Sequence, residues 1–285
     1  MNIGDIQQEL KSALLSIYDE AEASIIQQWV MDHYTGTARM QRMMDRNMAI
    51  TPDQILLIRS AKEQLLLHKP MQYVLGEAWF ANMQFFVNEN VLIPRPETEE
   101  LVAYLVASCQ LTVTSKLSIL DIGTGSGCIP IAIKKQLPTV QITAVDVCNE
   151  ALLVAIKNAA RHGTDIHFMH FDFLNETRWN ELPVFDCIVS NPPYITAKEK
   201  HGMAKHVTAW EPGTALFVPD NDALLFYKKI AAFGKTHLAP NGKIFVETHQ
   251  DYAIATQQMF ETNAYETELK KDINGNNRML LAWEK

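Results

Sequence analysis

The sequence lacks several features that mark membrane, secreted or nucleic-acid-coating proteins. No apolar run approaches the roughly 20 residues that a membrane-spanning helix needs, and the first residues show neither the basic nor the apolar segment of a signal peptide. The four cysteines are scattered without a CxxC pair, which favours reduced thiols in a cytoplasmic protein. Acidic residues outnumber basic ones by 33 to 25, a formal net charge of −8, which disfavours binding to phosphate backbones.

The remaining composition is that of an ordinary globular protein. Hydrophobic residues make up 47% of the 285 residues, charged residues 20%, and there are 12 glycines and 12 prolines, so a disordered or low-complexity chain is excluded. The length allows one large or two modest domains. The nine histidines show neither HExxH nor cysteine-paired spacing, so we expect no metal site.

The first 70 residues predict helices. Apolar residues recur every three or four positions over 6–17, which is typical of one helix face. Thr51, Pro52 and Gln54 form a capping-box signal for a helix beginning near 52. Segment 31–48 combines five methionines with three arginines, which is consistent with either an adaptable partner-binding face or a core stripe with a basic edge. We expect an N-terminal helical domain over 1–72 that recognises the substrate.

A different pattern follows over 73–97. Aromatic and β-branched residues lie between glycine and asparagine positions, which predicts a short β-hairpin, and Pro94 and Pro96 impose an extended stretch after it. We therefore place a hairpin linker at 73–97, followed by a helix over 98–109.

From residue 117 onward, apolar strands and helices alternate. This pattern predicts a parallel sheet covered by helices on both faces. The last two strands are separated only by a short Asn-Gly-Asn turn, so they should be antiparallel to each other. The long connection 195–221 is expected to form a wall or lid on the substrate side. The expected strands are 117–122, 141–146, 166–170, 185–190, 243–248, 264–270 and 278–284, and the expected helices are 127–136, 149–162, 222–237 and 250–262.

A glycine-rich turn directly follows the first of these strands. Residues 121–127 read DIGTGSG and open a helix, so backbone N–H groups there can approach a ligand closely. The G-x-G-x-G spacing differs from a dinucleotide fingerprint, and no GK[ST] follows. Asp146 ends the next strand, where a carboxylate can bind both hydroxyls of a ribose. A purely structural turn is the alternative.

The third strand leads into Asp172 and Phe173. At that edge, Asp172 could accept a hydrogen bond from an adenine amino group and Phe173 could stack on the ring. An exposed loop aspartate and a core phenylalanine are the alternatives.

The most specific motif is the run Asn191, Pro192, Pro193 and Tyr194, directly after strand 185–190. A diproline cannot continue a central strand, while the Asn191 amide oxygen is an acceptor and Tyr194 offers a ring face. Such a cluster can hold a planar –NH2 group with its lone pair directed at an electrophile.

Together these motifs resemble class I S-adenosylmethionine-dependent methyltransferases. The segments 70–76 (PMQYVLG), 91–99 (VLIPRPETE) and 190–195 (SNPPYI) resemble, more narrowly, the release factor glutamine N5-methyltransferase family. The resemblance implies an α/β fold with a seven-stranded Rossmann-like sheet whose last strand is antiparallel, with the methyltransferase domain over 98–285.

The resemblance also implies roles for individual residues. Gly123, Thr124, Gly125, Ser126 and Gly127 would bind the methionine end of S-adenosylmethionine. Asp146 would hold the ribose, with Asp172 and Phe173 around the adenine, although the family often has tryptophan at the latter position.

The substrate side follows from the same resemblance. Asn191, which would also touch the cofactor, and Pro192 would receive a glutamine amide, with Pro193 and Tyr194 packed beside it. Arg95 and Glu97 would line the site from the linker. The resemblance thus implies that Asn191, Pro192, Pro193 and Tyr194 are catalytic and bind substrate, and that Arg95 and Glu97 also bind substrate.

The expected reaction is direct methyl transfer to the glutamine of the Gly-Gly-Gln motif in class 1 peptide chain release factors, leaving S-adenosylhomocysteine. We expect a cytoplasmic monomer that binds neither membranes nor nucleic acid directly. Three alternatives stay open: glutamine methylation of a ribosomal protein, adenine N6-methylation of a nucleic acid, and a cofactor-binding scaffold without catalysis. The net charge of −8 disfavours the second.

Overall fold

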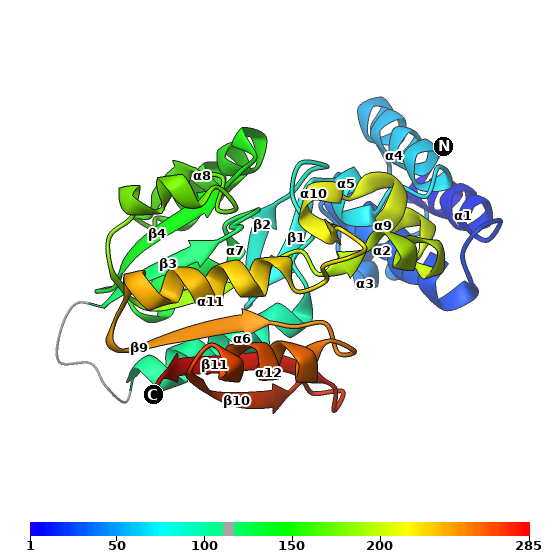
Figure 1. Ribbon diagram of the computed structural model, residues 1–285. Coiled ribbons are helices and arrows are strands. Elements are labelled where there is room, and N and C mark those ends of the chain that lie inside the picture. Colours follow the sequence, from blue (N-terminus) through cyan, green and yellow to red (C-terminus); the bar gives the residue numbers. More distant parts are fainter. Residues whose placement is uncertain (111–116) are drawn as a thin grey trace. The chain divides into compact units, whose positions relative to one another are not determined.

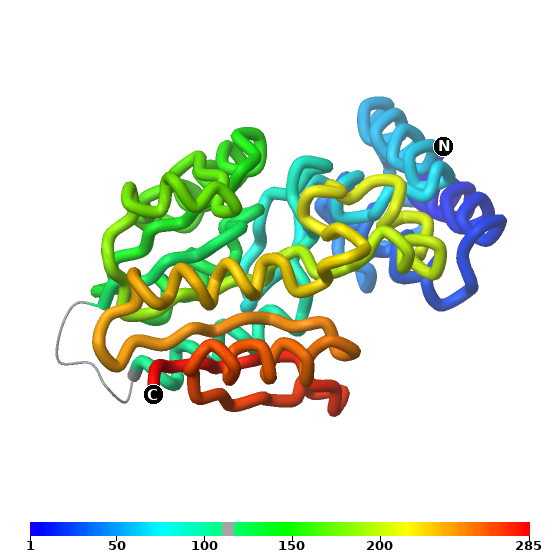
Figure 2. Tube along the Cα trace, viewed as in Figure 1, coloured from blue at the N-terminus to red at the C-terminus, as the bar shows by residue number. Residues whose placement is uncertain are grey.

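The computed structural model describes residues 1–110 and 117–285. The chain forms two compact units: Met1–Glu77 with Ala204–Trp210, and Ala78–Met203 with Glu211–Lys285. They are called here the N-terminal unit and the catalytic unit (Figures 1 and 2). No helix within the described residues has both the length and the apolar character that crossing a membrane requires.

The N-terminal unit is helical, as the sequence predicts. One face of each long helix is buried in a shared core that contains Leu10, Val30 and Leu65. The predicted capping box is confirmed, because the Thr51 hydroxyl accepts a hydrogen bond from the Gln54 amide (3.2 Å) and the Gln54 side chain accepts one from the Thr51 amide (3.0 Å). The helices are α1 (Ile3–Leu14), α2 (Glu20–Thr35), α3 (Arg39–Met44), α4 (Pro52–Leu66), α5 (Met71–Leu75) and α9 (Lys205–Trp210).

The catalytic unit is built on a seven-stranded sheet with the order β10-β11-β9-β6-β3-β4-β5. β11 pairs antiparallel with both β9 and β10, and the other described pairings are parallel. The predicted fold class and the antiparallel last strand are therefore confirmed. The strands are β3 (Ser118–Ile122), β4 (Gln141–Asp146), β5 (His167–His170), β6 (Phe185–Ser190), β9 (Leu238–Glu247), β10 (Tyr265–Lys271) and β11 (Asn277–Glu284).

Helices cover both faces of this sheet (Figure 1). Side chains of α6 (Pro96–Gln110), α7 (Cys128–Gln136) and α8 (Asn149–His162) pack on the face that includes Ile119. Side chains of α11 (Leu225–His237) and α12 (Ala253–Thr262) pack on the opposite face with Leu120. Successive residues of β3 are thus buried on opposite sides, which explains why the strands read as continuous apolar runs.

The hairpin is shorter than predicted. It consists of β1 (Glu77–Phe80) and β2 (Met83–Phe86), joined by Ala81 and Asn82, both with positive φ, the backbone that a tight two-residue hairpin turn requires. Residues 73–75, which the sequence places at the start of the hairpin linker, belong to α5 (Met71–Leu75) instead.

One buried side chain joins the hairpin to the catalytic core. The Asn158 amide donates hydrogen bonds to the carbonyls of Phe86 and Ser126, both at 2.9 Å, and its oxygen accepts one from the Phe86 N–H at 2.7 Å. Asn158 is fully buried, so its polar atoms need these partners.

The connection 195–221 is more structured than the sequence suggests. It contains two short parallel strands, β7 (Ile195–Thr196) and β8 (Phe217–Val218), and the short helices η2 (Ala197–Gly202), α9 and α10 (Gly213–Leu216). α9 belongs to the N-terminal unit, where the Trp210 indole donates to the Leu67 carbonyl at 3.3 Å. These elements are too short to produce a readable hydrophobic period.

Candidate active site at the carboxyl edge of the sheet

A cavity of about 360 Å³ lies in the catalytic unit where four parallel strands end. In open α/β sheets, this carboxyl edge is where ligands bind. The cavity is lined by residues after β3, β4, β5 and β6, with further walls from residues 90–92 and from the 212–219 segment. Of the residues singled out from the sequence, those that line it are Gly123, Gly125, Asp146, Asp172, Phe173, Asn191, Pro192 and Pro193.

The glycine-rich turn has three positive-φ residues. Gly123, Gly125 and Gly127 have φ values of 75°, 53° and 79°, a backbone region that residues with a Cβ enter only at a cost. The turn is held against β4, because the N–H groups of Gly123 and Thr124 both donate to the Val145 carbonyl, at 2.9 and 3.0 Å. Hydrogen bonds to the backbone of β4 therefore fix the conformation of this turn.

Three residues of the turn do not line the cavity. Thr124 and Ser126 are buried, at 3% and 2% exposure. Gly127 is the N-cap of α7 and lies against Ala155. Their predicted role toward the cofactor would therefore run through the turn that they form, rather than through atoms that line the cavity.

Asp146 lies at the end of β4 and faces both the turn and the cavity. Its carboxylate accepts hydrogen bonds from the Gly125 N–H at 2.8 Å and the Cys148 N–H at 2.9 Å. Burial raises the pKa of Asp146, and those N–H groups oppose the shift. A carboxylate here can bind hydroxyl groups of a ligand while also holding the turn.

Asp121 begins the glycine motif but received no role from the sequence. It is fully buried, and neither of its carboxylate oxygens accepts a hydrogen bond among the described residues. Burial raises its pKa to about 7. The charge of Asp146 adds to this upward shift and the Thr124 hydroxyl opposes it, while Asp121 itself is not among the residues that line the cavity.

The adenine-side residues divide between cavity and core. Asp172 is exposed and accepts a hydrogen bond from the Leu174 N–H at 3.0 Å. Phe173 is only 4% exposed, and its ring lies 5.7 Å from Trp179 and 5.3 Å from Phe233, centroid to centroid. Phe173 thus reaches the cavity with part of its surface, while most of the ring belongs to the core.

The Asn191 side chain is held by residues from two distant parts of the sequence. Its Nδ2 group donates to the Thr98 Oγ1 atom at 3.0 Å, and that hydroxyl donates to Glu247 Oε2 at 2.6 Å. The Tyr194 hydroxyl donates to the other oxygen, Glu247 Oε1, at 3.3 Å. Tyr194 does not line the cavity, and its predicted packing on the substrate stays untested.

Glu247 is a buried carboxyl at the end of β9, 1% exposed. Burial raises its pKa to about 7, and the charge of Glu97 acts in the same direction, whereas Thr98, Arg278 and Tyr194 favour the ionised form. The sequence analysis missed this residue, although the rule that selected Asp146, an acid at the carboxyl end of a strand, would also select Glu247.

The two linker residues do not line the cavity. Arg95 forms an ion pair with Glu211 at 2.6 Å, and Glu211 also accepts the Ile93 N–H at 3.3 Å. The pair anchors the linker to the segment that supplies Pro212 to the cavity wall. Glu97 reaches the site only through its charge, by raising the pKa of Glu247.

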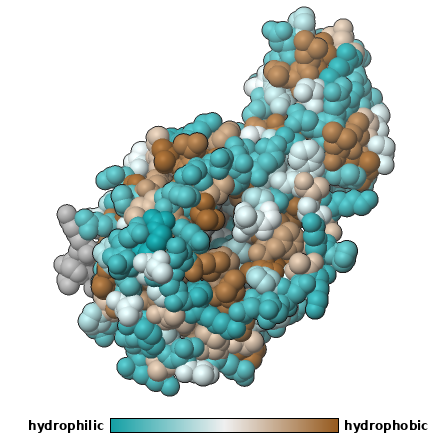
Figure 3. Space-filling model, turned by 45° about the horizontal axis from the view of Figure 1, so that its top comes forward, coloured by the Kyte–Doolittle hydropathy of each residue, from teal (hydrophilic) through white to brown (hydrophobic). Residues whose placement is uncertain are grey.

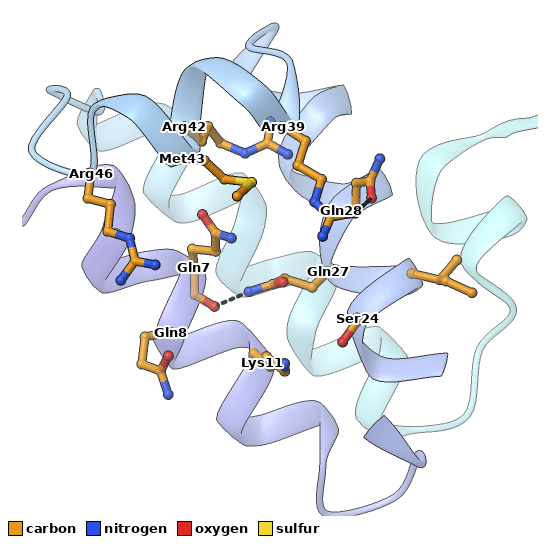
Figure 4. Close-up of a pocket in the computed structure, with 12 residues that line it drawn as sticks. Gln7, Gln8, Lys11, Ser24, Gln27, Gln28, Arg39, Arg42, Met43 and Arg46 are labelled. Carbon is orange, nitrogen blue, oxygen red and sulfur yellow. Dashed lines mark hydrogen bonds between the residues drawn. The ribbon is translucent and has the colours of Figure 1, made fainter. Parts of the chain in front are cut away.

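A second cavity of about 360 Å³ lies within the N-terminal unit, between α1, α2 and α3 (Figure 4). Arg39, Arg42 and Arg46 contribute from one side, and no carboxylate lines it among the described residues. Arg42 is 2% exposed and paired with Asp32 at 2.5 Å, so it is a structural residue. The other lining residues are Gly4, Gln7, Gln8, Lys11, Ser24, Ile25, Gln27, Gln28 and Met43.

The methionines of segment 31–48 divide in the same way. Met31 is buried in the core, whereas Met40, Met43 and Met44 are 73%, 64% and 83% exposed. The core interpretation therefore holds for Met31, whereas Arg42, expected at the basic edge, is buried, and the methionines of α3 are exposed. A space-filling view shows apolar residues in separate patches on a mostly hydrophilic surface (Figure 3).

Comparisons with known proteins identify the family of this chain. Residues 102–210 match the family Methyltransferase small domain, and residues 5–76 match the family PrmC N-terminal domain. The chain is 40% identical over 282 residues to the release factor glutamine methyltransferase of Flavobacterium psychrophilum, covering 98% of each chain. It is 36% identical over 274 residues to that of Bacteroides thetaiotaomicron, covering 96% of this chain and 97% of the relative.

The chain belongs to the release factor glutamine methyltransferase family. Solved structures of other methyltransferases share the fold of this protein. A methyltransferase from Pyrococcus furiosus superposes with a TM-score of 0.50 at 16% identity, covering 78% of this chain and 97% of the other. The Thermus thermophilus 16S rRNA N2 G1207 methyltransferase gives 0.50 at 17% identity, covering 73% and 50%.

Proposed function

We propose that this methyltransferase transfers a methyl group from S-adenosylmethionine to the side-chain amide nitrogen of a glutamine, the one in the Gly-Gly-Gln motif of class 1 peptide chain release factors. The observation that carries the proposal is the Asn191–Pro192 pair on the cavity wall, at the end of β6 and separated from β4 and β5 by β3, in a chain 40% identical to a release factor glutamine methyltransferase.

The cavity fits the cofactor. S-adenosylmethionine supplies an electrophilic methyl group on a cationic sulfonium. Asp146 would hold the ribose hydroxyls, and the backbone at Gly123 and Gly125 would face the methionine end. Asp172 and Phe173, which line the same cavity, would lie beside the adenine.

The substrate amide would be held by acceptors. Asn191 Oδ1 and the Pro192 carbonyl would accept the two amide hydrogens, with Pro193 and Tyr194 packed beside them. The ionisable residues that line the cavity, Asp146, Cys148 and Asp172, follow β4 and β5 rather than β6, so we assign no general base next to Asn191. Catalysis would rest on positioning, which can contribute about 7–11 kcal/mol, and on acceptors that stabilise positive charge developing on nitrogen. The proton would leave to water.

The test is methylation of a purified release factor, followed by mass spectrometry. The wild-type protein should methylate the glutamine, and Asn191→Ala should abolish turnover while S-adenosylhomocysteine still binds with an affinity near that of the wild type. A parallel arm offers double-stranded DNA and a ribosomal protein. Methyl groups found only in DNA or only in the ribosomal protein would overturn the proposal.

We propose that the release factor also contacts the cavity of the N-terminal unit through a segment that carries carboxylates. Arg39 and Arg46 are exposed on that cavity and form no ion pair among the described residues, so an acidic segment would complement them. Arg95 would act from the linker and Glu97 from the first turn of α6. The cytoplasmic location, the monomeric state and the absence of direct nucleic-acid binding remain parts of this proposal.

Charge reversal tests the docking surface. Arg46→Glu should raise the KM for the release factor about fivefold, the effect of a typical surface charge pair, without changing cofactor affinity. Lys271→Glu, an exposed position on β10 in the catalytic unit, is the matched control. Equal KM values for both variants would contradict the assignment.

A further inference from the structure

The amide of Asn191 can face the cavity in two ways, which differ in whether oxygen or nitrogen is presented to a ligand. The two orientations have almost the same shape but opposite hydrogen-bonding character. An oxygen would accept a hydrogen from a substrate amide, whereas an NH2 group would face it donor to donor. Whatever fixes the orientation therefore controls whether the site can hold its substrate.

The hydrogen bonds around Thr98 fix that orientation. Above about pH 7, where Glu247 is ionised, its carboxylate can only accept, so the Thr98 hydroxyl uses its single hydrogen on Glu247, at 2.6 Å. Its oxygen is then left as an acceptor, and Asn191 must present Nδ2 to it, at 3.0 Å. The Asn191 Oδ1 atom is thereby left for the cavity.

We propose that Thr98 and Glu247 are positioning residues that hold the Asn191 amide with its oxygen toward the substrate. The inference rests on the proposed function for its kinetic consequence, but the orientation itself stands on the hydrogen bonds. Thr98 is 2% exposed and Glu247 is 1% exposed, so water does not compete for these partners.

Glu247 also holds the second half of the motif. Its other oxygen accepts from the Tyr194 hydroxyl at 3.3 Å, and its backbone carbonyl accepts from the buried Tyr227 hydroxyl at 2.9 Å. The charged groups that act on it are Arg278 from β11 and Glu97 from α6. One carboxylate thus orients both ends of the Asn191–Tyr194 run.

The experiment compares Thr98→Val with Thr98→Ser in the full-length protein. Valine keeps the shape but removes the hydroxyl, and serine keeps the hydroxyl. Thr98→Val should lower kcat for the release factor about tenfold or more, the factor that corresponds to one lost hydrogen bond of ordinary net strength. Its affinity for S-adenosylhomocysteine should stay within twofold of the wild type, and Thr98→Ser should retain most of the kcat.

A second readout does not depend on turnover. The side-chain amide resonances of Asn191, assigned by their loss in Asn191→Asp, should shift in Thr98→Val and stay in place in Thr98→Ser. Unmoved resonances, a kcat for Thr98→Val within twofold of the wild type, or equal losses in both variants would overturn the inference. A wild-type protein that leaves glutamine unmethylated would overturn the proposed function, while the resonances would still decide the positioning role.

Discussion

Alanine substitution of two glycines in the same turn should affect the protein in different ways. Gly125 and Gly127 both have positive φ, 53° and 79°, so alanine costs roughly 1–2 kcal/mol of backbone strain at either position. At Gly127, the new Cβ would lie 3.1 Å from Ala155 Cβ and 3.2 Å from Ile131 Cδ1, whereas at Gly125 it would meet no atom within 4 Å. The difference between the two variants isolates the effect of this close packing.

The magnitudes follow from those distances. Crowding in a packed core typically costs about 1–3 kcal/mol, so Gly127→Ala should destabilise the catalytic unit by about 2–5 kcal/mol and Gly125→Ala by about 1–2 kcal/mol. Gly125 lines the cavity and Gly127 does not. Gly125→Ala should therefore weaken S-adenosylhomocysteine binding, and Gly127→Ala should leave the binding of the folded protein near the wild-type value.

Hydrogen exchange measured by mass spectrometry reports the local stability, because peptides from α7 follow the glycine turn directly. Calorimetric titration reports binding. Equal losses of stability in the two variants would refute the argument that Ala155 excludes a side chain at 127. Weaker binding in Gly127→Ala than in Gly125→Ala would refute the assignment of Gly125 to the ligand side.

Three further predictions concern charged side chains. Asp146→Ala removes two charge-assisted hydrogen bonds to the proposed ribose, so the Kd for S-adenosylhomocysteine should rise about 100-fold or more by calorimetry; a change below fivefold would reject that role. The pKa of Glu247, about 7 in the folded state against 4.5, means that the unfolded chain loses this proton first as the pH rises. The wild type should therefore lose about 2–3 kcal/mol of stability between pH 5 and pH 8 relative to Glu247→Gln, as measured by urea unfolding; parallel pH profiles would contradict this. Arg42→Ala should destabilise the N-terminal unit by about 1–3 kcal/mol because buried polar atoms, including those of Asp32, lose their partner. Arg46→Ala should change the free energy of unfolding of this unit by less than about 0.5 kcal/mol.

Local patterns explain why much of the fold could be predicted. The capping box at Thr51 and the apolar runs of the sheet depend on neighbours within a few residues, so the sequence displays them directly. The glycine turn and the Asn191–Tyr194 run also lie at strand ends, where topology alone brings them to one edge.

Other features depend on partners far away in the sequence. Asn191 binds Thr98, 93 positions away, and Thr98 in turn binds Glu247, 149 positions further along, and neither pair has a local signature in the sequence. Arg95 looked like a site residue because of its motif, yet Glu211 takes up its charge. Phe173 follows a strand as predicted, but Trp179 and Phe233 draw most of its ring into the core. The contacts of these side chains depend on residues that only the folded chain brings close to them, so the local sequence does not reveal them.

The Asn158 side chain also couples the local unfolding of two segments of the catalytic unit, the hairpin and the glycine turn. Its amide binds the β2 backbone at Phe86 and the glycine turn at Ser126. If either segment detached, buried polar atoms would lose their hydrogen-bond partners. The hairpin and the turn should therefore exchange their backbone hydrogens together, with the same opening free energy. A loss of order that begins in the hairpin would reach the cofactor side of the cavity as one cooperative step.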